Sequence, residues 1–292
     1  MLRIGAVSYL NTKPLIEGLR EGLDGRASLS LNLPSRLADD LRGDRLDIAL
    51  VPSVESFRLL DGRVVSDAAI GCVGPVWSVR LVSRVPAAKI RTLALDVGSR
   101  TSAAMVQVLL FEKFGIRPTL IPLAMDDSPE HIDADASLII GDRAMHPERG
   151  VYREIWDLGD RWVRRLQMPF VFAMWVARPG LDLEHPEVHR VVEEIQMARD
   201  LGVTRLDEIA RRHAAMHGLT DEDLERYFRD NLHFYLGEPQ VDALRHFRDR
   251  CISLGLVPAQ ANWPLDHRPS HTEPLAPTTA EHPTLTNFRP TN

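Results

Sequence analysis

The segment 96–102 has the residue types of an anion-binding turn. Its sequence is DVGSRTS, and the residues after it have the apolar spacing of a helix. The first amides of a helix have no partner within it, and the helix dipole favours negative charge at that end. Arg100 adds a planar guanidinium that suits a carboxylate, whereas an ordinary Ser or Thr helix cap is the alternative interpretation. We expect Ser99, Arg100, Thr101 and Ser102 to bind a small anion.

Two other segments bring polar side chains to the ends of predicted strands. The segment 8–14, SYLNTKP, lies between a strand and a helix. Ser8 and Asn11 could hydrogen-bond the oxygens of a substrate there, although capping of the following helix explains them equally well. Asp142 follows the mainly apolar residues 137–140 and one glycine, and a solvated or capping carboxylate is its alternative role. All three side chains are candidate substrate contacts.

A further strand end carries Ser53 and Glu55, which follow the mainly apolar residues 47–51. Ser53 could cap a helix and Glu55 could occupy its favourable first turn, or both could face a ligand. His213 and His217 have the spacing of a zinc-binding pair, but the general-base Glu of a metalloprotease is missing, so we expect a solvated helix face. Because the polar strand ends contain no His, a usual general base near neutral pH is scarce among them.

The order of the predicted elements indicates a parallel sheet with helices on both faces. Residues 2–7 are apolar except for Arg3, 27–33 alternate between apolar and polar residues, and 47–51 are mostly apolar. Helical spacing follows each of these segments, and Pro14 suits the first turn of the first helix. This is the βαβαβα pattern of an α/β fold. Further strands are expected at 76–83, 93–97, 118–123, 137–140 and 170–177, and helices at 101–114, 186–201, 205–217, 221–231 and 239–254.

The strands at 76–83 and 170–177 are predicted to cross between two lobes. Lobe 1 then comprises residues 1–82 together with 177–258, and residues 83–176 form an inserted lobe 2. Two lobes joined by two strands make a hinge over a cleft, where the carboxyl ends of the strands meet. The polar strand ends described above would converge on this cleft.

The composition excludes several classes of protein. The net charge is −6, so there is no basic surplus to neutralise the phosphates of a nucleic acid. No apolar run approaches the length of a membrane span, and the N-terminal residues lack the pattern of a secretory signal. We therefore expect a cytoplasmic protein without membrane or nucleic-acid partners, and the oligomeric state does not follow from the sequence. Residues 259–292 are rich in Pro and Thr, and we expect a disordered tail there.

The polar segments together resemble those of the chorismate dehydratases of the futalosine route to menaquinone. The resemblance covers roughly residues 2–257. It implies a periplasmic-binding-protein type II-like fold, an α/β architecture in which each lobe has a mixed, mainly parallel sheet flanked by helices. Residues 166–168 are Leu-Gln-Met where the family has Thr-Gly-Leu, which affects only the turn before Pro169. The segments that carry the resemblance are 5–15, 47–55, 99–102, 140–142, 157–162 and 169–175.

This resemblance implies a hydro-lyase. Chorismate, a dicarboxylate, would lose its ring hydroxyl as water and give 3-[(1-carboxyvinyl)oxy]benzoate. No cofactor and no metal is implied, because formation of the aromatic ring drives the reaction. The ring proton could be taken by the substrate's own enolpyruvyl carboxylate, held in place by the protein, or by Glu55 or Asp142.

The resemblance also suggests roles for the polar strand ends. Asn11, Ser8 and Asp142 are the expected catalytic residues, of which Asn11 and Ser8 orient the departing hydroxyl or the substrate side chain. The expected substrate-binding residues are Ser53, Glu55, Ser99, Arg100, Thr101 and Ser102.

Three other functions are open on the sequence alone. A solute-binding protein of the same fold would bind a small carboxylate without converting it, since fold alone does not separate binding from catalysis. A related 1,4-dihydroxy-6-naphthoate synthase typically begins with a Ser-Pro-Cys-Pro-Asn-type turn, which differs from residues 8–14. A ligand-sensing regulatory domain is the third, but no helix-turn-helix pattern accompanies it.

Overall fold

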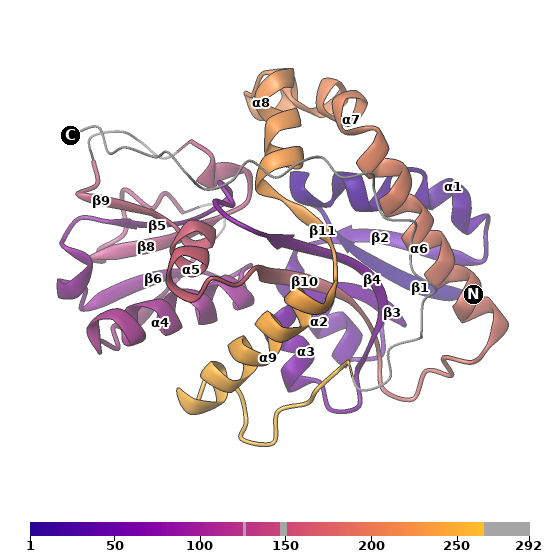
Figure 1. Ribbon diagram of the computed structural model, residues 1–292, viewed down its shortest axis with the longest axis horizontal. Helices are drawn as coiled ribbons and strands as arrows, with labels where there is room; N and C mark the ends of the chain where they lie inside the picture. Colours follow the sequence, from indigo (N-terminus) through magenta and orange to yellow (C-terminus); the bar gives the residue numbers. More distant parts are fainter. Residues whose placement is uncertain (125–126, 147–150, 266–292) are drawn as a thin grey trace.

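The computed structural model describes residues 1–124, 127–146 and 151–265, which form two α/β lobes (Figure 1). Figure 1 shows the two sheets beside each other, with lobe 2 on the left and lobe 1 on the right. The sheet of lobe 1 contains, in spatial order, β11 (His233–Tyr235), β4 (Arg63–Cys72), β10 (Phe170–Ala177), β3 (Ile48–Pro52), β1 (Leu2–Val7) and β2 (Ala27–Asn32). The sheet of lobe 2 contains β7 (Thr119–Leu123), β6 (Thr92–Asp96), β8 (Ala136–Ile140), β5 (Val79–Ser83) and β9 (Glu154–Asp157).

Helices cover both sheets. Lobe 2 carries α4 (Arg100–Phe114), α5 (Leu158–Leu166) and the short 3-10 helices η2 (Ala87–Lys89) and η3 (Asp142–Ala144). Lobe 1 carries η1 (Leu10–Ile16), α1 (Leu19–Leu23), α2 (Pro34–Arg42), α3 (Ser53–Arg58), α6 (Pro186–Thr204), α7 (Leu206–His213), η4 (Ala215–His217), α8 (Asp221–Arg226), the π-helical turn η5 (Tyr227–Asn231) and α9 (Glu238–Ser253). Helix α9 packs on β10 and α3 of lobe 1 and on α4 of lobe 2, so it ties the two lobes together. None of the helices in the described ranges has the length and apolar character that a membrane crossing requires.

The two mixed sheets confirm the predicted two-lobed α/β fold. β1 pairs in parallel with β2 and β3, and β6 pairs in parallel with β7 and β8. The expectation of mainly parallel sheets is wrong, because five antiparallel pairings stand beside four parallel ones in the described residues. The strands next to the crossings between lobes, β4, β5 and β10, supply the antiparallel pairings.

The sheets place the crossings between the lobes slightly differently from the sequence. β5 begins at Val79 in the sheet of lobe 2, and β10 lies with its whole length in the sheet of lobe 1. The predicted division instead assigned residues 79–82 to lobe 1 and residues 170–176 to lobe 2. We therefore propose that the chain crosses at residues 73–78 and 167–169.

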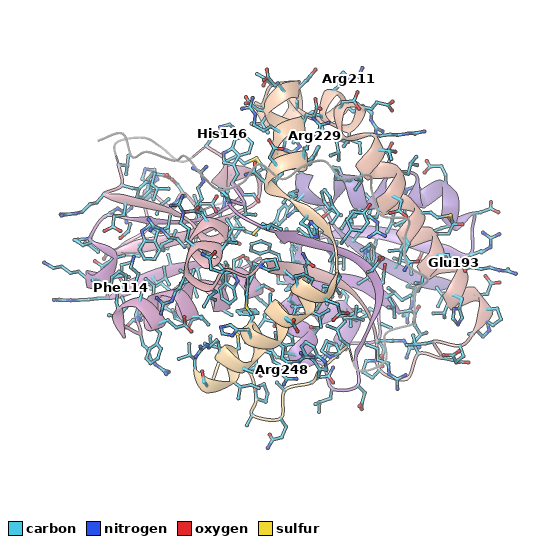
Figure 2. All side chains as sticks on the ribbon, in the orientation of Figure 1. Phe114, His146, Glu193, Arg211, Arg229 and Arg248 are labelled. Carbon is cyan, nitrogen blue, oxygen red and sulfur yellow. The ribbon has the colours of Figure 1, made fainter. Side chains whose placement is uncertain are left out.

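The first crossing is fixed to lobe 2 by a carboxylate. Asp157, at the end of β9, accepts hydrogen bonds from the backbone N–H groups of Val76 (2.9 Å) and Trp77 (2.7 Å). Trp77 has a left-handed backbone, with a φ of 62°, and its ring centroid lies 5.7 Å from that of Tyr227 in η5. The centroid of the Trp77 ring also lies 6.5 Å from that of the His146 ring. Figure 2 shows His146 at the upper boundary of the two lobes. These contacts hold the crossing against lobe 2 and against η5.

An aromatic cluster connects the lobes on another side. Trp162 of α5 lies 4.8 Å from Phe170 of β10 and 5.7 Å from Phe247 of α9, measured between ring centroids. Phe170 and Phe247 are 5.0 Å apart, and all three side chains are buried. Most buried apolar residues of both lobes therefore form one continuous core across this junction, and six buried residues of lobe 2 form a separate cluster.

Residues 259–265 belong to the folded part of lobe 1, which corrects the predicted start of the tail at 259. The Nδ2 group of Asn262 donates hydrogen bonds to the carbonyl oxygens of Leu59 and Gly62, both at 2.9 Å. These bonds satisfy the turn between α3 and β4, so the segment is part of the fold. The rest of the predicted tail, 266–292, lies outside the described residues.

The segment after β1 is a 3-10 helix rather than the expected α-helix. η1 contains Pro14, and Gly18, with a φ of 71°, separates η1 from α1. Helix α6 packs directly on η1. A Cβ atom at Gly202 of α6 would lie 1.8 Å from the carbonyl oxygen of Pro14, so this close approach requires glycine. Contact with α6 therefore positions η1, which carries Asn11.

Candidate active site

A cleft between the lobes contains five of the nine predicted site residues. Its empty space is about 540 Å³, part of which is open to solvent, and residues of both lobes line it. This size suits a small molecule. Lobe 1 contributes Val7, Tyr9, Asn11, Pro34, Pro52, Ile70, Phe172 and Ala173, and the first crossing and lobe 2 contribute Val76, Ser78, Val79, Ser99, Arg100, Thr101, Ser102, Ile140 and Gly141.

The lining lies at the carboxyl ends of strands, as predicted. Val7 ends β1, Pro52 ends β3 and Ile140 ends β8, and all three residues line the cleft. In α/β sheets the carboxyl ends of parallel strands are the usual place for a ligand. The cleft therefore occupies the position that the order of strands and helices indicates.

The turn before α4 presents polar groups to this cleft. Helix α4 follows Ser99, whose side chain makes no capping hydrogen bond to the helix. The turn is closed instead by Asp96, whose Oδ1 accepts a hydrogen bond from the N–H of Gly98 at 2.8 Å. Ser99, Thr101 and Ser102 are buried and line the cleft. The structure thus disfavours the interpretation as an ordinary helix cap, and the helix terminus can receive an anion.

Arg100 lines the cleft from lobe 2, but carboxylates of lobe 1 hold its guanidinium. Its Nη1 and Nη2 atoms donate to the two carboxylate oxygens of Asp39 in α2, both at 2.9 Å. The Nη1 atom also lies 3.3 Å from Oε2 of Glu55 in α3. The hydrogen bonds from Arg100 lower the pKa of Asp39, so this carboxylate stays ionised at neutral pH. The side chain of Arg100 therefore bridges the two lobes at the cleft.

Glu55 is next to this bridge and does not line the cleft. Its carboxylate is 3% exposed and accepts hydrogen bonds from Arg42 Nη2 and Arg58 Nη1, both at 2.5 Å. With Arg100, three guanidinium groups surround its negative charge. We call Asp39, Arg42, Glu55, Arg58 and Arg100 the cleft cluster, which carries three positive and two negative charges.

Asn11 and Tyr9 line the cleft from lobe 1. The Oδ1 atom of Asn11 accepts a hydrogen bond from Thr12 Oγ1 at 3.2 Å. Tyr9 packs against Gly141 of lobe 2, where φ is 68° and a Cβ atom would lie 3.5 Å from the tyrosine ring. Burial raises the pKa of the Tyr9 hydroxyl, so it stays protonated at neutral pH and can donate a hydrogen bond to a ligand.

Two predicted contacts, Ser8 and Ser53, lie outside the lining. Ser8 is exposed, and its N–H donates to the carbonyl oxygen of Asn32 at 3.1 Å, which continues the ladder between β1 and β2. The hydroxyl of Ser53 is fully buried and donates to the carbonyl oxygen of Val171 in β10 at 2.8 Å. It joins α3 to β10 inside lobe 1, away from the space that a substrate would occupy.

Asp142 lies beside the cleft and pairs with a histidine of the other lobe. Its Oδ2 atom is 3.0 Å from Nδ1 of His217 in η4. Burial raises the pKa of Asp142, and the charge of His217 opposes this effect in part. The expectation that His217 belongs to a solvated helix face is therefore wrong. Among the described residues, no three His, Cys, Asp or Glu side chains are arranged to hold a metal ion.

Twelve residues of the lining were not predicted as site residues, and four of them could contact a ligand through a polar group or a large apolar side chain. Tyr9 stands inside the first polar segment, beside Asn11, so its place in the sequence was an available signal. Ser78, whose Oγ accepts a hydrogen bond from the hydroxyl of Tyr227 at 2.8 Å, is the last residue of the first crossing. Ile70 and Phe172 are apolar residues of β4 and β10, and their residue types do not separate them from the core.

Sequence comparisons match the chain to a family with a biosynthetic role. The family model described as "Menaquinone biosynthesis" matches residues 2–253. The chorismate dehydratase of Thermus thermophilus is 29% identical over 89% of this chain and 98% of that relative. The chorismate dehydratase of Campylobacter jejuni is 23% identical over 87% of this chain and 99% of that relative. Both relatives are thus matched over nearly their whole length.

Solved structures resemble the fold as a whole. A protein from Archaeoglobus fulgidus superposes with a TM-score of 0.68 and 15% identity, over 88% of this chain and 98% of that chain. The periplasmic aliphatic sulphonate binding protein SsuA from Escherichia coli gives a TM-score of 0.61 and 16% identity, over 96% of this chain and 97% of that chain. At these identities the similarity concerns the fold alone, and it confirms the predicted periplasmic-binding-protein-like architecture.

Proposed function

Because the chain belongs to the menaquinone biosynthesis family, we propose that it is a chorismate dehydratase. The proposed reaction is a hydro-lyase step in which chorismate loses one water and becomes 3-[(1-carboxyvinyl)oxy]benzoate. The observation that supports this best is the cleft, where the helix terminus at 99–102 and the donors Asn11 and Tyr9 surround space for a small dianion. The reaction needs no cofactor, because formation of the aromatic ring supplies the driving force.

In this proposal, one carboxylate of chorismate binds at the turn 99–102. The amides and hydroxyls of this turn, the helix dipole and the positive surplus of the cleft cluster all favour negative charge there. Asn11 and Tyr9 donate hydrogen bonds to the ring hydroxyl and to the second carboxylate, while Ile70 and Phe172 supply apolar surface for the ring. Such positioning lowers a reaction barrier by roughly 7 kcal/mol or more in favourable cases.

The proposed proton acceptor is the enolpyruvyl carboxylate of the substrate. The described lining of the cleft contains no carboxylate, imidazole or amine. Glu55 and Asp142, the alternative bases, lie outside this lining and are engaged by arginines and by His217, respectively. The substrate carboxylate takes the proton from the ring carbon, the electrons of that C–H bond form the new ring double bond, and the hydroxide leaves with the proton as water.

The direct test is to incubate the purified protein with chorismate, without added metal or cofactor, and to separate the products by chromatography with mass detection. We expect a product lighter by one water, with the spectrum of a meta-substituted benzoate. If chorismate stayed intact but raised the melting temperature, the protein would be a binding protein. If chorismate did neither, the proposed substrate would be wrong.

Amide and acid variants test the proton acceptor. Glu55→Gln and Asp142→Asn should keep kcat within a few-fold of the wild type, since neither carboxylate takes the proton. Asn11→Asp should reduce turnover about 100-fold, equivalent to roughly 2.7 kcal/mol, because a negative charge there repels the carboxylates of the substrate. Steady-state kinetics measures both effects, with circular dichroism as the control for folding. Loss of turnover in Glu55→Gln at unchanged substrate affinity would instead assign the base to Glu55.

A solute-binding protein of the same fold is the second candidate. The Escherichia coli protein with this fold is named for binding aliphatic sulphonates, and a helix terminus in a cleft serves binding as well as catalysis. Product analysis separates the two functions, since a binding protein would return chorismate unchanged. The cytoplasmic location stays a prediction.

A further inference from the structure

We propose that Asp39 is a built-in competitor for Arg100, which a carboxylate of the substrate displaces on entering the cleft. This inference rests on the proposed function, because it concerns how the same cleft accepts a dicarboxylate. Arg100 lines the cleft, yet its two Nη atoms donate to the two oxygens of Asp39, each at 2.9 Å. A bound carboxylate would form this same bidentate arrangement with an arginine. Asp39, which lies outside the lining, therefore occupies the two guanidinium donors that a ligand carboxylate would use.

Of the two carboxylates on Arg100, Asp39 is the one that can leave. Its side chain is 40% exposed, and Arg42 Nη1 offers it a second partner at 3.4 Å. Glu55, by contrast, is buried and held by both Arg42 and Arg58 at 2.5 Å. Released Asp39 keeps a cation and water around its charge, whereas released Glu55 would have no access to water.

The charges of the cleft cluster favour arrival of a further anion. Three guanidinium groups face two carboxylates, so the cluster has a surplus of one positive charge. A ligand carboxylate at Arg100 would balance this surplus, and Asp39 would shift onto Arg42. No proton moves in the exchange, because both the ligand and Asp39 stay ionised.

The exchange couples ligand binding to the contact between the lobes. Asp39 belongs to α2 of lobe 1 and Arg100 to α4 of lobe 2, so their ion pair joins the lobes at the cleft. When a ligand takes the place of Asp39 on Arg100, the direct ion pair between the lobes is lost, and the ligand contacts both lobes instead. The competitor also makes the cleft selective, because an anion with a single weak contact gains too little to displace a bidentate ion pair. A rigid molecule with two carboxylates satisfies this requirement.

The test compares Asp39→Asn with a control at the next residue. Asp39→Asn keeps the shape of the side chain and removes its charge. Asp40→Asn removes a charge one position away, where Asp40 pairs with Arg45 at 2.7 Å and makes no ion pair with Arg100. For the wild type and both variants, kinetics gives KM and kcat for chorismate. Calorimetry gives the Kd of isophthalate, a rigid benzene dicarboxylate that has no hydroxyl to lose.

Asp39→Asn should lower both KM and Kd about tenfold, which corresponds to about 1.4 kcal/mol, while kcat changes by less than about twofold. Asp40→Asn should leave all three values unchanged. Equal or weaker binding by Asp39→Asn would overturn the proposal, and so would an equal gain in Asp40→Asn, which would indicate only a general effect of charge.

The two proposals fail in distinguishable ways. If the wild type did not convert chorismate, the proposed function would be wrong, and the Kd of isophthalate would still decide whether Asp39 competes for Arg100. If neither the wild type nor Asp39→Asn bound isophthalate or chorismate, the competition itself would be wrong. Melting temperatures of both variants close to that of the wild type serve as the control for folding.

Discussion

Two groups of arginines and carboxylates lie near opposite ends of the strands in the lobe 1 sheet. One group lies within lobe 1, and the other connects the two lobes. In the rear cluster, defined as Arg3, Asp47 and Arg178, Asp47 accepts hydrogen bonds from Arg3 Nη2 and from Arg178 Nε, both at 2.9 Å. Arg3 belongs to β1, Asp47 directly precedes β3 and Arg178 directly follows β10, so a movement of the lobes leaves their distances unchanged. The cleft cluster takes Arg100 from lobe 2. A movement between the lobes would therefore change ion-pair distances in the cleft cluster and leave those of the rear cluster unchanged.

The surroundings of the two clusters differ both in size and in charge. The hollow beside the rear cluster contains about 1180 Å³ of empty space, more than the 540 Å³ of the cleft. Its arginines and carboxylates balance, however, whereas the cleft cluster has a positive surplus. Surplus charge, rather than volume, marks the cleft as the place for an anion. The charged residues of the rear hollow are Arg3, Arg26, Arg178, Asp47, Asp182 and Glu187.

Loss of Arg100 should produce the largest difference between the two clusters. Arg100→Ala removes the positive surplus and the guanidinium that would bind the ligand, so kcat/KM for chorismate should fall about 100-fold. This loss corresponds to one or two hydrogen bonds to a charged group, of roughly 1.5–3 kcal/mol each. Arg165→Ala is the matched control, because Arg165 pairs with Glu112 on α4 at 3.0 Å and does not line the cleft. Kinetics that changed no more for Arg100→Ala than for Arg165→Ala would show that Arg100 is purely structural.

Asp47→Asn should come second, and its effect should be on stability. The hydrogen bonds from Arg3 and then from Arg178 hold the pKa of Asp47 well below its usual range. The ionised carboxylate therefore stabilises the fold above about pH 4, and this contribution is lost as the pH falls through the lowered pKa. We expect a loss of about 2 kcal/mol at pH 7, less than for a fully buried pair because Arg3 is partly exposed.

Urea unfolding of the wild type and Asp47→Asn at pH 7 and at pH 3 measures this contribution. The difference between the two proteins should be smaller at pH 3, and kcat of the folded variant should equal that of the wild type. A difference in unfolding free energy that stayed constant with pH would contradict an ionic role for Asp47. A fall in kcat would contradict the separation of the rear cluster from the cleft.

Ser53→Ala should have the smallest effect. It separates a residue that stabilises the fold next to the cleft from Ser102, which lines the cleft. It removes the buried hydrogen bond to Val171, so the free energy of unfolding should fall by about 1 kcal/mol. KM for chorismate should stay unchanged, whereas Ser102→Ala, which alters the lining, should raise it. Thermal melts and kinetics of both variants make the comparison. A raised KM in Ser53→Ala would return this residue to the binding role that the sequence suggests.

The candidate site was predictable where its chemistry is local. The turn 99–102 combines a glycine, hydroxyls and an arginine at the start of a helix, and these residues do line the cleft. The roles of Ser53 and Glu55 depend instead on Val171 and Arg100, which lie far along the chain. A short segment of sequence carries no signal of such distant partners. A hydroxyl or a carboxylate at a strand end therefore has the same local sequence pattern whether it faces a ligand or the protein.

The fold was predictable wherever periodicity is clear, and β4 shows where it is not. Its sequence, RVVSDAAIGC, neither alternates nor forms a continuous apolar run, yet most of its residues are buried. Burial comes from β10 and β11 on its two edges and from α6 on one face. Asp67 within β4 is tolerated because Arg199 of α6 pairs with it at 3.1 Å. Compensation by a distant residue overrides the local pattern in this strand.

The place of β10 in the sheet also sets the order in which the lobes can form during synthesis. β10 lies between β3 and β4, but the ribosome makes both of these neighbours long before it makes β10. Until residue 177 has emerged, β3 has one unpaired edge and β4 has two, and such edges invite wrong pairing. The strands of lobe 2 come from one uninterrupted stretch of chain. Lobe 2 can therefore finish first, and the waiting strands of nascent lobe 1 are the natural target of a chaperone.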